Sequence, residues 1–154
     1  MTARMKSPAA ILPAVLQPMQ ALYPAAHTGG VPAATMALVH LRASQINGCS
    51  FCVEHTVKGA KKAGETDERL FAVSAWREAP YFTDSERAAL ALSESMTRLS
   101  DSADPVPDAV WNEAARHFDE QGLASLVVWI ATSNLYNRVN VATRQPAGKA
   151  SWDK

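Results

Sequence analysis

Residues 42–55 read RASQINGCSFCVEH, and they contain the end of one predicted helix and the beginning of the next. The first of these helices opens at Pro32, and its apolar positions recur at near-helical intervals (Met36, Val39, Leu41 and Ile46). Asn47 and Gly48 are typical of a helix stop. The second helix is predicted over residues 50–63 and begins directly at two cysteines.

Outward from this segment, the chain continues as helices separated by short loops. Thr83 and Glu86 form the spacing of a capping box, which is the clearest start signal in the sequence. Helix starts are also predicted at Pro8 with Ser7 as the cap, and near residues 66, 108 and 119, the last helix reaching about residue 142. Strand patterns are almost absent, so we predict an all-α helical bundle.

Composition limits the domain count and the classes of partner. With 154 residues and 47% hydrophobic residues, the chain fits a single domain over residues 1–154, with a helical extension (1–31), a core (32–144) and a tail (145–154). Fifteen basic residues balance fifteen acidic ones, which argues against nucleic acid or an anionic membrane as a partner. No apolar run approaches the roughly 20 residues of a membrane span, and Pro13 interrupts the apolar stretch that follows Lys6, against a secretory signal. We expect a cytoplasmic protein.

The last predicted helix is apolar nearly all round from residue 123 to residue 131. Such a helix is buried on several sides, and a subunit interface can share in covering it. A polar band follows in the same helix, where it can cap buried backbone or cross a subunit boundary (Asn134, Asn137, Arg138, Asn140 and Arg144).

Cys49 and Cys52 are the only cysteines of the chain, and they stand as a CxxC pair at a helix start. Unsatisfied N–H groups and the positive end of the helix dipole stabilise a thiolate there, which is the reactive form of cysteine. The spacing also lets one sulfur capture an oxidised partner as a disulfide. A redox pair is the leading interpretation. Two inert buried cysteines, or half of a metal site, are the alternatives, although His55 is the only further metal ligand nearby.

Around these cysteines the sequence resembles the alkylhydroperoxidase AhpD and carboxymuconolactone decarboxylase-like family, in its CxxC branch. In that family one helix ends in Ser-Gln-x-Asn-Gly and the next begins with CxxC. The resemblance continues through KKAGETDERLFAVSAWREAPYFTDSERAALAL and IATSNLYNRVNVATR, and so covers residues 32–144.

This resemblance implies an all-helical protein that assembles as a trimer or hexamer and acts as a thiol-dependent peroxidase. Cys52 would attack the hydroperoxide and Cys49 would resolve the resulting sulfenic acid to a disulfide. An external dithiol or a disulfide reductase would then restore both thiols, since the chain has no other cysteine. No flavin, haem or nicotinamide motif is present, so we expect no cofactor and no metal.

The sequence departs from the family pattern at both members of its proton relay. The family has a histidine four residues after the second cysteine, where this chain has Thr56, and a glutamate twelve residues before the first cysteine, where it has Ala37. His55 arrives one residue early, roughly 60° from Cys52 around the helix, while Thr56 lies roughly 40° away. We predict His55 as the catalytic base, with Thr56 or His40, one turn beyond Ala37, as the other candidates.

Two further functions fit the same residues. A thiol–disulfide exchange protein would use the CxxC pair without any peroxide. A redox-sensing or structural family member would turn over nothing and bind partners through its oligomer surface.

Overall fold

The computed structural model describes residues 2–148, so residues 149–154 of the predicted tail lie outside it. Residues 2–148 form eight α-helices and two short 3-10 helices and contain no strand, which confirms the predicted all-α class. The elements are α1 (Pro8–Ile11), α2 (Pro13–Ala26), α3 (Ala33–Ile46), α4 (Ser50–Lys62), α5 (Asp67–Ala72), η1 (Val73–Ala75), α6 (Asp84–Thr97), η2 (Leu99–Asp101), α7 (Asp108–His117) and α8 (Glu120–Thr143).

Local signals set most of these boundaries. The predicted capping box is present: Thr83 accepts a hydrogen bond from the Glu86 backbone, and the Glu86 carboxylate accepts one from the Thr83 N–H at 2.9 Å. The first helix was predicted incorrectly in part. It begins at Pro8, but the Ser7 side chain makes no cap bond, and the helix breaks at Leu12 because the following Pro13 disfavours helical backbone in the residue before it.

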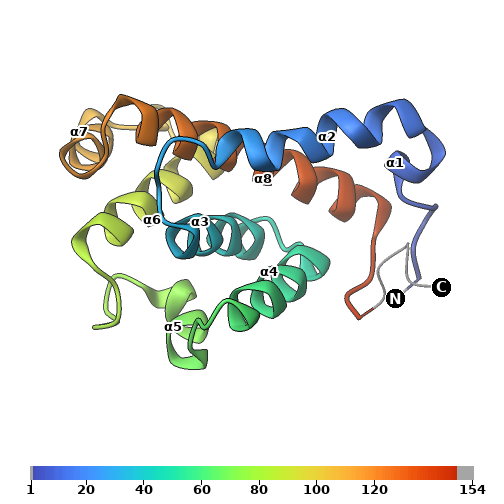
Figure 1. The fold of residues 1–154 in the computed structure, drawn as a ribbon, viewed down its shortest axis with the longest axis horizontal. Coiled ribbons are helices and arrows are strands. Elements are labelled where there is room, and N and C mark those ends of the chain that lie inside the picture. The colour runs from blue at the N-terminus through green and yellow to red at the C-terminus, as the bar shows by residue number, and fades with distance from the viewer. Residues whose placement is uncertain (1, 149–154) are drawn as a thin grey trace.

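Helix α3 lies at the centre of the bundle, with α2 and α8 along one side and α4 and α5 on the other (Figure 1). Two of its residues, Met36 and Val39, join a hydrophobic cluster with α6, α7 and α8. Two others, Leu38 and Leu41, join a second cluster with α4, α5 and α6. The central helix therefore binds both halves of the core together, and it carries the cysteine loop at its end.

Helix α8 is buried on several sides, as predicted, but not all round in the protomer. Leu126 and Ile130 are fully buried, but Val128 is 42% exposed and Leu135 is 39% exposed. One apolar face of this long helix is thus open to solvent in the protomer. None of the helices formed by residues 2–148 has the length and apolar character that crossing a membrane requires.

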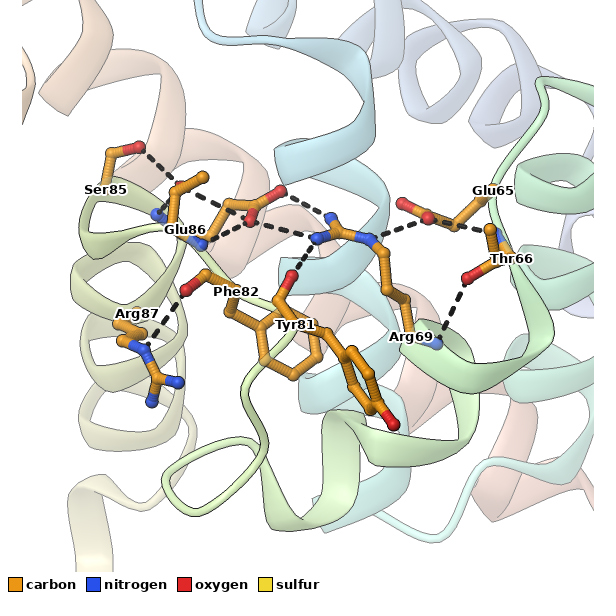
Figure 2. A network of polar contacts seen from close by, with 9 residues as sticks. Glu65, Thr66, Arg69, Tyr81, Phe82, Ser85, Glu86 and Arg87 are labelled. Atoms are coloured by element: carbon orange, nitrogen blue, oxygen red, sulfur yellow. Dashed lines mark hydrogen bonds and ion pairs between the residues drawn. The ribbon is translucent and has the colours of Figure 1, made fainter.

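An ionic network joins α5 to α6 beyond the end of α4 (Figure 2). The Arg69 guanidinium contacts Glu65 at 2.8 Å and Glu86 at 2.6 Å, and it also donates to the Tyr81 carbonyl. Burial alone would raise the pKa of Glu86, but the hydrogen bonds from Arg69 and the Thr83 backbone outweigh it and hold that pKa below its usual range. The network fixes the segment that follows the cysteine helix.

The N-terminal helices lie along α8 (Figure 1). The Tyr136 hydroxyl donates to the Met19 carbonyl at 2.6 Å, and the Arg4 N–H donates to the Thr143 carbonyl at 2.9 Å. Because these bonds join residues far apart in the sequence, α1 and α2 are held against α8. This position makes them one wall of the site.

Candidate active site

The cysteine loop depends on a left-handed glycine. Gly48 has a φ of 66°, which turns the chain from α3 into α4 and which residues with a side chain rarely adopt. Cys49 then becomes the N-cap of α4, its sulfur accepting a hydrogen bond from the Cys52 N–H at 3.2 Å. Cys49 and Cys52 are joined by a disulfide, with their Cα atoms 5.3 Å apart. The two cysteines are therefore placed for disulfide chemistry at the start of a helix.

The polar band of α8 is hydrogen-bonded to this loop. The side-chain amide of Asn47 donates to the side-chain oxygens (Oδ1) of Asn134 and Asn137, at 2.9 Å each. Asn137 in turn donates to the Ser44 hydroxyl at 3.0 Å. Asn140, one turn further along, donates to the Cys52 sulfur at 3.3 Å. The sequence predicts a capping role for this band, but it does not single out Asn140 as a partner of the thiol.

Both sulfur-bearing residues are nearly inaccessible from bulk solvent, Cys49 being 2% and Cys52 3% exposed. Cys52 nevertheless lines a partly open cavity of about 380 Å³ whose walls come from α1, α2, α3, α4 and α8. Cys49 is absent from that lining. A small molecule in the cavity thus reaches Cys52 first.

The three candidates for the proton relay have different surroundings. His55 is exposed, stacks nearly parallel on Phe51 with ring centroids 6.0 Å apart, and lines the cavity. Thr56 is buried and donates its hydroxyl proton to the Cys52 carbonyl at 2.8 Å, so that proton is engaged in the helix. The structure thus brings His55 to the same cavity as Cys52 but shows no hydrogen bond between the two.

His40 lines the cavity from α3 and is 9% exposed. Its ring stacks on Trp129 at 5.2 Å, and its Nδ1 lies 2.7 Å from the Ser133 hydroxyl. Burial, together with the nearby charge of His55, lowers the pKa of His40 to about 4. His40 is therefore neutral at physiological pH. Within residues 2–148, no group of three or more His, Cys, Asp or Glu side chains is placed to hold a metal ion.

The chain matches known proteins in both sequence and fold. A profile described as the Carboxymuconolactone decarboxylase family matches residues 13–95. The uncharacterized protein YdfG of Bacillus subtilis (strain 168) is 37% identical over 108 residues, which cover 70% of this chain and 72% of YdfG.

Solved structures show the same fold. A protein of unknown function from Agrobacterium tumefaciens, described as a candidate antioxidant defence protein AhpD, is 29% identical with a TM-score of 0.88, covering 97% of this chain and 100% of that one. The debrominase Bmp8, at 19% identity and a TM-score of 0.80, shares the fold over 92% of this chain and 75% of its own. The chain has an AhpD-like fold and belongs to the carboxymuconolactone decarboxylase family.

Proposed function

We propose that this protein is a thiol-dependent peroxidase that reduces hydroperoxides through Cys49 and Cys52. The observation that carries the proposal is the asymmetry of the pair: Cys52 lines the cavity, whereas Cys49 lies behind it within bonding distance. The N-terminus of α4 and the Asn140 amide both favour a negative charge on the Cys52 sulfur.

In the reaction, the Cys52 thiolate attacks the terminal oxygen of the hydroperoxide. An S–O bond forms, the O–O bond breaks, and the alkoxide takes up a proton to leave as an alcohol. The Cys49 thiol then attacks the Cys52 sulfenic acid, which gives the disulfide and water. We assign His55 as the base that accepts the Cys52 thiol proton, since its imidazole lines the same cavity and is open to solvent.

Regeneration requires an electron donor that can reach a buried disulfide. With the two cysteines 2% and 3% exposed, the opening through the cavity favours an external dithiol carried on a slender chain. A disulfide reductase could act on the pair only by inserting such a group. The same burial disfavours general thiol–disulfide exchange between protein surfaces. A cytoplasmic location, where thiol reductants are abundant, is part of this proposal.

The test is to treat the reduced protein with one equivalent of cumene hydroperoxide and to map the cysteines by peptide mass. We expect an intramolecular disulfide in the wild type, a stable sulfenic acid at Cys52 in Cys49→Ser, and no fast oxidation in Cys52→Ser. Oxidation of Cys52→Ser at the wild-type rate would overturn the order of attack. If peroxide leaves both cysteines unchanged while a dithiol still exchanges with them, an exchange protein replaces the peroxidase. If neither reagent reacts, the protein is a non-catalytic family member.

A second candidate reaction is reductive removal of bromine from an aromatic ring. The cavity is lined by several rings (Tyr23, Phe51, Trp129 and Tyr136). The structurally similar Bmp8 is named a debrominase, and a cysteine-to-alanine variant of Bmp8 has been crystallised in complex with 2,3,4-tribromopyrrole. In such a reaction, two thiols become a disulfide while C–Br becomes C–H and HBr leaves. Bromide release from this compound by the reduced protein, lost in Cys52→Ser, would establish the activity.

We also propose that the protein assembles as a homo-oligomer, a trimer or a hexamer. The support is the apolar face of α8 that remains exposed in the protomer (Val128 and Leu135). Light scattering coupled to size exclusion should give a mass above the 16.6 kDa of one chain. Val128→Lys should lower that mass, and a monomeric wild type would refute the assembly.

A further inference from the structure

Among the described residues, the lining of the cavity beside Cys52 includes no side chain with a permanent charge. The residues that line it include no Asp, Glu, Lys or Arg, and apolar and aromatic side chains dominate its walls. An anion bound here would lose its hydration without gaining a permanent counter-charge from Lys or Arg, which is a large cost in an apolar site. The cavity therefore favours an uncharged ligand with an apolar body.

Three polar side chains that line this cavity already donate a proton within the protein. The Tyr136 hydroxyl donates to the Met19 carbonyl, Thr56 donates to the Cys52 carbonyl, and the Asn140 amide donates to the Cys52 sulfur. None of these three protons is available to a ligand without breaking an existing bond. His40 can offer a ligand an acceptor instead of a donor, because only one of its two ring nitrogens has a hydrogen-bond partner among the described residues.

The tautomer of His40 follows from its neighbours. The Ser133 hydroxyl has one proton, and it donates that proton to the Trp129 carbonyl at 2.7 Å. In its contact with His40, the same oxygen can only accept, so Nδ1 of His40 carries the ring proton. The neutral ring then has a bare Nε2, which is an acceptor and not a donor. A ring 9% exposed and stacked on Trp129 has little freedom to turn away from the cavity it lines.

We propose that this cavity binds uncharged, apolar organic molecules that carry one hydroxyl-type donor, and that Nε2 of His40 accepts the hydrogen bond from that donor. In the reaction proposed above, on which this assignment rests for its catalytic meaning, the donor is the terminal O–H of an organic hydroperoxide. His40 then orients the O–O bond toward the Cys52 sulfur, while the apolar body fills the cavity. His40 itself gains and loses no proton in the step.

This assignment gives the two histidines of the cavity different tasks. His55 is exposed and can exchange a proton with water, as a base must. His40 is buried, neutral and fixed in one tautomer, which suits recognition of a donor. The lack of Lys and Arg in the lining predicts that the cavity also selects ligands by charge. A carboxylate on the apolar body should prevent binding, and a methyl ester of that carboxylate should restore it.

Binding can be tested on the disulfide form of the full chain without any turnover. The probes are cumyl alcohol, which has the donor, cumene, which lacks it, para-carboxycumyl alcohol and the methyl ester of that acid. Calorimetry should show the alcohol binding about tenfold more tightly than cumene, the value of one hydrogen bond in a dry site. The carboxylate should bind at least about tenfold more weakly than its ester.

His40→Asn should remove the difference between the alcohol and cumene while leaving cumene binding unchanged, because Asn keeps a donor toward Ser133 but has no nitrogen at the Nε2 position. Ser133→Ala provides a second variant, in which His40 remains but its tautomer is no longer fixed, so the same difference should shrink. Either variant retaining the full wild-type difference would overturn the role of His40. Equal binding of the acid and its ester would overturn the selection for uncharged ligands.

The outcome for the binding site can be separated from that for the peroxidase. Cumene hydroperoxide and its para-carboxy derivative are next compared as oxidants of Cys52 in the reduced protein. If both oxidise Cys52 at equal rates, the peroxidase stands and the selection for uncharged ligands fails. If neither oxidises Cys52 but the alcohol binding depends on His40, the peroxidase fails and the binding site stands.

Discussion

Lowering the pH from 7.5 to 4.5 should weaken the fold through one side chain in particular, His40. Its folded pKa is about 4 against an ordinary value of 6.5, chiefly because burial on α3 disfavours the imidazolium. The groups that face it are Ser133 and Trp129 from α8 and His55 from α4, and none of them is a carboxylate. Among residues 2–148, no anion is therefore placed to compensate for a charge on His40.

The sign and the size of the change in unfolding free energy follow from the difference between the folded and unfolded pKa of His40. Below about pH 6.5 the unfolded chain binds a proton at His40, whereas the folded protein binds it only near pH 4. The unfolded state thus holds more protons between these values, and the free energy of unfolding falls as the pH falls. At 1.36 kcal/mol per pH unit, the loss is about 2.5 kcal/mol by pH 4.5 and about 3 kcal/mol below pH 4.

Urea unfolding of the disulfide form, followed by circular dichroism at several pH values, measures this loss. The quantity compared is the change in unfolding free energy with pH, in wild type and in His40→Asn, so an offset in absolute stability of the variant does not matter. Glu86 and Glu94, whose pKa values are lowered, contribute to acid sensitivity in both proteins and cancel. His55→Asn should make the loss only slightly smaller, because the charge of His55 is the lesser of the two causes that lower the pKa of His40. If His40→Asn loses as much stability as wild type between pH 6.5 and 4.5, the reasoning about His40 is refuted.

Three further changes test the site and its supports. Asn140→Ala should raise the pKa of the Cys52 thiol by about one pH unit, because a hydrogen bond to a charged sulfur contributes about 1.5 kcal/mol. The pH dependence of the alkylation rate of the reduced protein measures this pKa. An alkylation profile equal to that of the wild type would contradict the role of Asn140. Glu86→Ala removes the capping box and an ion pair, and it should lower the free energy of unfolding by about 2–3 kcal/mol. Glu113→Ala, which removes an ion pair at the surface, should change that free energy by less than about 0.5 kcal/mol. Equal losses for the two variants in urea unfolding would refute the greater contribution of Glu86. Gly48→Ala should cost only about 1–2 kcal/mol of unfolding free energy, since its Cβ would meet open space and the cost lies in the backbone φ alone; a much larger loss would point to a clash instead.

The sequence predicted well those features that depend on residues close along the chain. The capping box of Thr83 and Glu86 spans three residues, and so does the pair Cys49 and Cys52. In both cases helical geometry alone determines the distance, whatever packs around it. The family resemblance also predicted how the helices pack together, which local patterns do not specify.

Features that join distant segments could not be predicted in the same way. The contact of Asn140 with the Cys52 sulfur spans 88 residues, and that of His40 with Ser133 spans 93. Both depend on how α8 packs against α3 and α4, which no local pattern specifies. The break at Leu12 is different, because the proline that causes it stands next to it in the sequence, where it indicates both the end of an apolar run and a helix boundary.

The two departures from the family relay have a common physical consequence. Ala37 and Thr56 leave the cavity without the expected carboxylate and without the expected histidine, and the cavity instead holds His40 and His55, with no acidic side chain in its lining. A carboxylate beside an imidazole favours the charged form, whereas two imidazoles disfavour it in each other. His55 does lower the pKa of His40 here, together with burial. The exchange of residues therefore removes a carboxylate from the cavity as well as relocating a base, and this is the basis of the proposed selection for uncharged ligands.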